Sequence, residues 1–147
     1  MKKRKDRKSQ AWLPIPAGIS EEGLYQELVR RHPQYRRALE RGETMMEGGE
    51  EVNPQMHLQM HLVVEKQIRG GDPDFVAEAA LRLERAGVHP HEVRHLLALP
   101  VVYQAFAVAK EGRSYGQDEH RLAIEQILLE HLPQRLSPIR GDKPRPN

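Results

Sequence analysis

The chain has 147 residues, of which 38% are hydrophobic and 30% are charged, and its formal net charge is +2. This length is typical of one domain with a buried core. The absence of cysteine excludes disulfides and thiolate zinc sites, so any metal ion must be held by imidazole and carboxylate groups. No apolar run approaches the roughly 18 residues of a membrane-spanning helix, and no secretion signal is recognisable. We therefore expect a cytoplasmic protein without a membrane segment.

Both ends of the chain are basic. Residues 1–8 contain six basic residues and one acidic residue. We expect residues 1–11 to form a disordered basic leader, residues 12–133 a helical bundle and residues 134–147 a disordered tail. The leader is either a solvated segment or a tether to RNA, the ribosome or another polyanion. Trp12 is expected to anchor the leader to the body of the protein.

Two short helices are predicted in the first third of the chain. Ser20 is a suitable N-cap for the first one. Pro33 interrupts this helix and suits the first turn of the second, which is expected to end near Gly42. Residues 43–52 are expected to form a loop. No segment has the alternating polar and apolar pattern of a strand, so no sheet is expected.

Four longer helices are predicted in the rest of the chain, over residues 54–69, 73–86, 90–110 and 119–132. Each follows a residue that can cap it: Asn53, Asp72, His89 and Asp118, respectively. The short linkers between successive helices favour antiparallel neighbours. The sequence therefore predicts an all-α fold, an up-down bundle of about five helices.

Two histidine pairs carry most of the functional information. His57, His61 and Glu65 have the spacing His-x₃-His-x₃-Glu, and His91 and His95 belong to an H-E-x-x-H string. Residues four apart lie on one helix face, so each pair can hold a cation between two imidazoles. Both pairs lie in the first two turns of their helices, and these helices flank a single antiparallel one. The two pairs are therefore expected to lie at the same height and to form one site.

We predict a metal site between the helices that start at Pro54 and Pro90, with a Zn, Fe or Mn ion. The candidate ligands are imidazoles and carboxylates of these two helices: His57, His61, His91, His95, Glu65 and Glu92. Burying four imidazoles without partners is costly, and a metal ion satisfies them together. A hydrogen-bonded histidine core is the simpler alternative.

The sequence leaves the reaction open. If the protein is an enzyme, a metal-dependent hydrolase or a di-iron-type oxidoreductase fits the donor set. In zinc peptidases the Glu of H-E-x-x-H is the general base. Here Glu92 also falls at the third helical position, where Glu is favoured for capping and for the helix dipole. A different class of function is a non-enzymatic adaptor with a structural histidine core, which docks on nucleic acid or the ribosome through its leader.

The chain resembles a bacterial family of uncharacterised proteins, domain-of-unknown-function family 1841. The resemblance spans roughly residues 24–130 and depends on motifs in the same order and spacing: His32-Pro33-x-Tyr35, Asn53-Pro54-x-x-His57-Leu58-x-x-His61-x-x-x-Glu65-x-Gln67, Pro73, Arg82-Leu83, His91-Glu92-x-x-His95, Phe106 and Gly112. It implies a compact all-α fold and makes these histidines the expected working residues, but it implies no reaction.

One segment departs from the family pattern. In the family, a Met-Met-Glu-Cys stretch follows the second histidine pair, and another Glu comes a turn later. This chain has Leu96-Leu97-Ala98-Leu99 and then Val102 at these positions. The resemblance therefore does not extend to a full carboxylate-bridged di-iron site.

Overall fold

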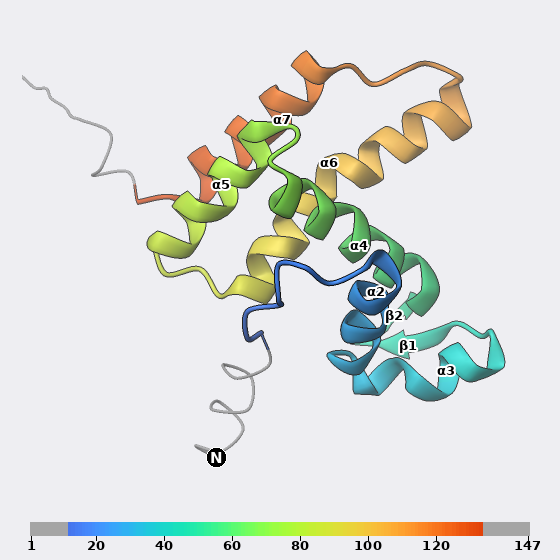
Figure 1. The fold of residues 1–147 in the computed structure, drawn as a ribbon. Coiled ribbons are helices and arrows are strands. Elements are labelled where there is room, and N and C mark those ends of the chain that lie inside the picture. The colour runs from blue at the N-terminus through green and yellow to red at the C-terminus, as the bar shows by residue number, and fades with distance from the viewer. Residues whose placement is uncertain (1–11, 134–147) are drawn as a thin grey trace, which may run out of the picture.

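The computed structural model describes residues 12–133. In chain order its elements are α2 (Glu21–Arg30), the 3₁₀ helix η1 (Pro33–Tyr35), α3 (Arg36–Arg41), β1 (Met45–Glu47), β2 (Glu50–Val52), α4 (Pro54–Gly70), α5 (Asp74–Arg85), α6 (Pro90–Glu111) and α7 (Gln117–His131) (Figure 1). The all-α prediction is confirmed. In this part of the chain, none of the helices combines the length and apolarity that crossing a membrane requires. The predictions for residues 1–11 and 134–147, including RNA or ribosome binding through residues 1–8, lie outside the described residues.

Side-chain caps fix the starts of α2, α4 and α6. Ser20 Oγ accepts the backbone N–H three residues on at 3.0 Å, and Asn53 Oδ1 does the same at 3.1 Å. At the start of α6, His89 Nδ1 accepts the N–H of His91 at 3.1 Å. These hydrogen bonds satisfy N–H groups that have no partner inside the helix. Because the starts of α4 and α6 are fixed in this way, the heights of their histidines are fixed as well.

Two other helix starts differ from the prediction. α5 begins after Pro73, which is its N-cap and not its first residue. α7 begins after Gly116, whose backbone N–H donates to Glu119 Oε1 at 3.1 Å. Asp118 therefore lies inside the first turn of α7 and is not its cap. The side chain of Glu119 accepts the N–H of the N-cap residue, as in a capping box, so the predicted aspartate cap is absent.

The loop predicted over residues 43–52 is a small hairpin, so the prediction of no sheet is wrong here. β1 and β2 pair antiparallel, with Glu47 opposite Glu50. Gly48 and Gly49 connect them with φ angles of 61° and 86°. A two-residue hairpin turn with positive φ at both positions suits the twist of the strands and is readily adopted by glycine. The strands themselves are short and mostly exposed, so they leave no alternating pattern in the sequence.

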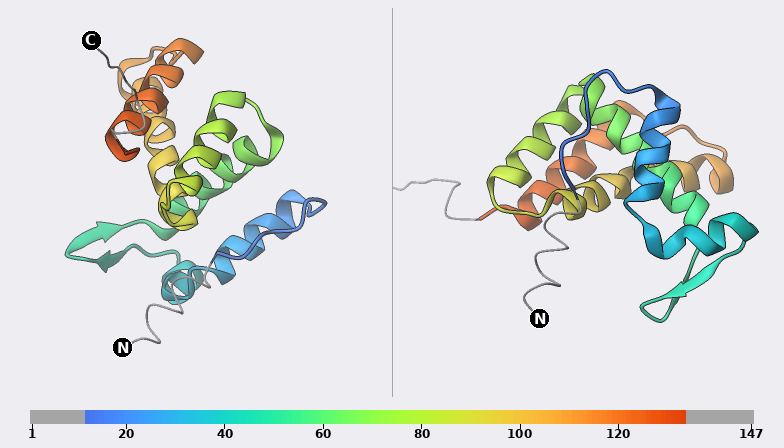
Figure 2. Two further views of the ribbon diagram at one scale, coloured as in Figure 1. Left: turned by 90° about the vertical axis from the view of Figure 1, so that its left-hand side faces the viewer. Right: turned by 60° about the horizontal axis from the view of Figure 1, so that its bottom comes forward.

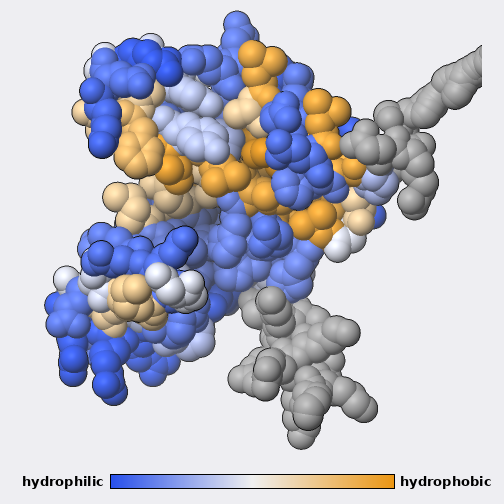
Figure 3. All heavy atoms as spheres, turned by 180° about the vertical axis from the view of Figure 1, so that it is seen from behind, coloured by the Kyte–Doolittle hydropathy of each residue, from blue (hydrophilic) through white to orange (hydrophobic). Residues whose placement is uncertain are grey.

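α4 lies between two separate cores. One, the α5–α7 core, consists of aliphatic side chains and one phenylalanine: Val64, Phe75, Val76, Ala79, Ala80, Leu83, Val93, Leu96, Leu97, Val101, Ile124 and Ile127. The other, the α2 core, contains two aromatic residues and four leucines: Trp12, Leu24, Leu28, Tyr35, Leu58 and Leu62. Figure 2 shows α2, α3 and the hairpin on one side of α4, and α5 to α7 on the other. In Figure 3 the half with α2, α3 and the hairpin, at the lower left, is mainly hydrophilic at its surface.

Candidate metal centre

Five imidazole rings meet where α2, α4 and α6 approach one another. We call them the imidazole cluster: His32, His57, His61, His91 and His95. One ring nitrogen from each of the first four lies within 4.8 Å of the other three. The two helical pairs therefore converge, as expected. His32 was not among the predicted ligands. Its neighbour Pro33 was used only to place a helix boundary, although His32 belongs to the family motif His32-Pro33-x-Tyr35.

The nitrogen atoms of three rings share one meeting point. His91 Nε2 lies 3.2 Å from His32 Nε2 and 3.2 Å from His61 Nε2. His32 Nδ1 donates to the carbonyl oxygen of Leu28 at 2.8 Å, so the neutral ring keeps a lone pair on Nε2. Each ring nitrogen carries either a proton or a lone pair. A single proton on His91 Nε2 would have to be shared between the lone pairs of His32 and His61, whereas a cation can accept a lone pair from all three nitrogens.

Burial keeps the cluster neutral. His32 and His61 are almost fully buried. Burial, with a smaller contribution from neighbouring histidines, lowers the pKa of His57 to about 4 and the pKa of His91 to about 3. The same causes lower the pKa of His61 as well. Neutral imidazoles have the lone pairs that metal ligation requires, so the rings are ready to bind a metal ion near pH 7.

Several ring nitrogens of the cluster lack hydrogen-bond partners. Within the described residues, His57 Nε2, His61 Nδ1 and His95 Nε2 are buried atoms without a partner. Leaving a buried polar atom unpaired costs about 1–3 kcal/mol. The ring of His95 has one exposed edge and one buried edge, because the side chain is 42% exposed although its Nε2 is buried. Its buried edge faces the rings of His57, His61 and His91, at centroid distances of 5.2, 5.1 and 4.4 Å.

The two carboxylates proposed as ligands lie elsewhere. Glu65 is buried, and its two oxygens accept from Arg94 Nε at 3.0 and 3.3 Å. Arg94 also pairs with Glu84 at 2.7 Å, so Glu65 belongs to an ion-pair network between α4, α5 and α6. Glu92 is 58% exposed in the first turn of α6, 3.9 Å from His95 Nδ1. Neither carboxylate is among the four converging groups.

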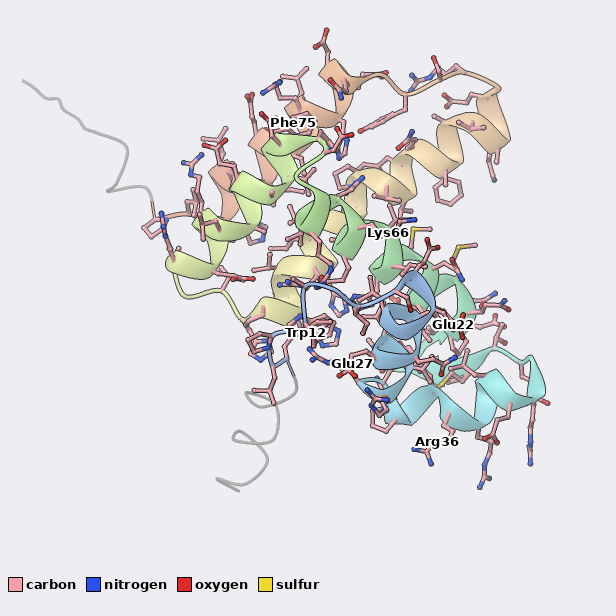
Figure 4. The ribbon with its side chains drawn as sticks, viewed as in Figure 1. Trp12, Glu22, Glu27, Arg36, Lys66 and Phe75 are labelled. Atoms are coloured by element: carbon pink, nitrogen blue, oxygen red, sulfur yellow. The ribbon has the colours of Figure 1, made fainter. Side chains whose placement is uncertain are left out.

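Trp12 covers one side of the cluster. Its ring stacks on His91 and His61 at centroid distances of 4.6 and 5.6 Å. The guanidinium groups of Arg31 and Arg94 lie 4.9 and 5.4 Å from the indole centroid. Figure 4 shows Trp12 near the start of α6, beside α2. The expected anchoring residue is therefore also the cover of the site.

A family model described as Domain of unknown function (DUF1841) matches residues 5–126. The chain belongs to this family. No curated protein and no solved structure matches the chain. The DUF1841 match covers every histidine of the cluster, and it supplies no activity. The chemistry of the site therefore follows from its own geometry.

The donor set of this DUF1841 chain consists of imidazoles alone. Its four converging groups come from three elements, since His32 follows α2 while the others belong to α4 and α6. Imidazole suits Zn, Fe, Cu and Ni, whereas Mg, Ca and Mn prefer oxygen ligands. The arrangement can therefore hold a transition-metal ion and link the three elements around it.

Proposed function

We propose that this protein binds a transition-metal ion through His32, His57, His61 and His91. The observation that carries the proposal is the convergence of four buried ring nitrogens within 4.8 Å. Structural histidines usually pair with carboxylates or backbone carbonyls, and only His32 does so here, through Leu28. The other three rings of this set face one another instead of such partners.

The spacing of the nitrogens supports this proposal. Bonds of about 2.1 Å from a tetrahedral ion put neighbouring ligand nitrogens about 3.4 Å apart, and bonds at right angles put them about 3.0 Å apart. The two separations at His91 Nε2, to His32 and to His61, are both 3.2 Å. The four nitrogens lie within 4.8 Å of one another, so binding of one ion to all four requires the more distant ring nitrogens to move inward.

The proposed metal is Zn or Fe. Both were expected from the sequence, and both accept imidazole ligands. Mn was also expected, but it prefers carboxylate oxygens, and Glu65 is held by Arg94. A ligand set that joins α2, α4 and α6 stabilises the folded state, because the ion binds only where all three elements are in place.

Metal analysis of the full-length protein tests the proposal. Protein purified without an affinity tag that binds metal should carry one transition-metal ion per chain, because the four imidazoles form a single group. His61→Ala should lose most of this metal. His131→Ala is the matched control, because His131 lies at the end of α7 and its Nδ1 bonds to the Ile127 carbonyl at 2.9 Å. Wild-type protein that neither contains nor takes up Zn or Fe would contradict the proposal.

A further inference from the structure

The five rings of the imidazole cluster have a regular arrangement. His61 packs against each of the other four, with centroid distances of 4.8 Å to His32, 4.9 Å to His57, 4.9 Å to His91 and 5.1 Å to His95. It therefore lies above the other four rings as an apex.

The other four rings form a closed square. His32 and His57 are 5.2 Å apart, His57 and His95 5.2 Å, His95 and His91 4.4 Å, and His91 and His32 4.9 Å. Across the square, the pairs His57 with His91 and His32 with His95 make no ring contact in the described part of the chain. A tetrahedral set would bring all its rings equally close, so this pattern is a square pyramid.

From this arrangement we infer that His95 is a fifth ligand of the proposed ion, and that the position opposite His61 is open to a small exogenous ligand. This inference rests on the proposed metal binding. Ring centres about 3.3 Å from an ion, at right angles to one another, are about 4.7 Å apart. The eight centroid distances of the pyramid range from 4.4 to 5.2 Å around this value.

The buried edge of His95 supports its role. Its Nε2 is buried and has no partner in the described residues, whereas its Nδ1 lies on the exposed side, 3.9 Å from Glu92. Ligation through Nε2 would satisfy the buried atom and leave Nδ1 to Glu92. Such a contact between a carboxylate and the second nitrogen of a ligand is common at metal sites, because it orients the ring.

Two aromatic residues contact the pyramid at different places. Trp12 stacks on His91 at 4.6 Å and on the apex ring, His61, at 5.6 Å, and so covers the pyramid where these two rings meet. Tyr35 packs on two rings of the square, His32 and His57, at 5.4 and 5.2 Å. It makes no ring contact with His61 within the described residues, so it lies at the edge of the square that His32 and His57 form, away from the apex.

Tyr35 brings a carboxylate to this edge of the square. Its hydroxyl donates to Glu47 Oε1 at 2.7 Å, and Glu47 lies at the end of β1. Tyr35 thus holds the exposed carboxylate of Glu47 near the edge of the square that His32 and His57 form.

This environment selects the ligand. A carboxylate at the edge of the square can accept a hydrogen bond from a ligand at the open position and repels anions. The ligand class is therefore a small protic molecule, of which water is the simplest. Glu47 is a positioning residue in this inference, because it acts on the bound ligand and not on the metal.

Cobalt(II) loading of the full chain tests the coordination number. Wild-type protein should show the weak visible absorption of five-coordinate or six-coordinate Co(II). His95→Ala should show stronger absorption, because four ligands favour a tetrahedral ion, and added imidazole should restore the weak spectrum. His131→Ala should match the wild type. Tetrahedral absorption from the wild type, or an unchanged spectrum in His95→Ala, overturns the inference while metal binding stands. Failure to take up Co(II), Zn or Fe overturns the proposed function itself.

Azide tests the open position. Titration of Co(II)-loaded wild-type protein should change the visible spectrum, and Glu47→Gln should bind azide several-fold more tightly, because a repelling charge is lost. Glu50→Gln is the matched control, since Glu50 is opposite Glu47 in the hairpin and exposed. No response of the wild type to azide overturns the open position. Equal azide affinity in Glu47→Gln and wild type overturns the placement of Glu47 beside it.

Discussion

The two sides of α4 differ in what holds them together. The α5–α7 core is built from side chains without hydrogen-bonding groups, so packing alone satisfies it. The imidazole cluster lies at the other side, where buried ring nitrogens lack partners among the described residues. Packing of apolar side chains accounts for the first core, whereas a ligand would satisfy several buried ring nitrogens of the cluster at once. Substitutions that act on one side only can separate these two sources of stability.

The largest effect is expected in the α5–α7 core. Leu83 is fully buried in α5, and Leu83→Ala should lower the free energy of unfolding by about 2–5 kcal/mol through lost burial and a cavity. Leu81→Ala, on an exposed position of the same helix, should change it by less than about 0.5 kcal/mol. Urea denaturation should give the same loss for Leu83→Ala with metal and with chelator. A loss that vanishes in chelator would link this core to the metal site.

The next effect concerns metal removal. With free metal at a hundredfold excess over its dissociation constant, the wild type should be about 2.7 kcal/mol more stable than in chelator. His57→Ala and His91→Ala should each lose most of this difference, although they lie on different helices. The double variant should lose little more than either single one, because both residues act through one ion. Thermal melts with and without chelator measure this, and fully additive losses would contradict a shared ion.

A smaller effect distinguishes a ligand from a supporting residue. Glu65→Gln removes the charge that pairs with Arg94, and it should cost about 1–3 kcal/mol because a buried partner is left unsatisfied. Metal content should stay at the wild-type level. Arg82→Gln, on an exposed position of α5, serves as the control for loss of a surface charge. Metal loss from folded Glu65→Gln would make Glu65 a ligand, as the sequence suggested.

Local rules predicted the helices and four of the five rings of the imidazole cluster. Asn53 and His89 mark the starts of α4 and α6, and spacing by four residues placed His57 beside His61 and His91 beside His95. Convergence of the pairs followed from short linkers. His32 could not be found in this way, because it lies outside a helix and no repeated spacing links it to the others.

The remaining differences also depend on tertiary contacts. Glu65 has the spacing of a ligand, but it forms an ion pair with Arg94, which belongs to another helix. The hairpin escaped prediction because its strands are only three residues long and mostly exposed, so burial leaves no pattern. Glu47, at the hairpin's turn, meets Tyr35 only in the folded protein. Spacing along the chain identifies groups on one element, but partners from other elements require the structure.

The smallest expected effect is a pH dependence on the α5–α7 side. His120 is buried in α7 with its ring edge-on to Phe75 at 5.0 Å, and burial lowers its pKa. Above the ordinary histidine pKa of about 6.5 the ring is neutral in both states, so its contribution to stability is constant. Below that pH the unfolded chain binds the proton more readily, so stability falls until the pKa of the folded state is passed. The free energy of unfolding of the wild type should therefore fall relative to that of His120→Leu on acidification, by no more than about 1.4 kcal/mol per pH unit. Urea denaturation in chelator from pH 8 to pH 5 measures both free energies of unfolding. The imidazole cluster is intact in both proteins, so its protonation affects the two equally. A constant difference across this range would show that the folded protein accepts a charged His120, and would remove the contrast drawn between the two sides of α4.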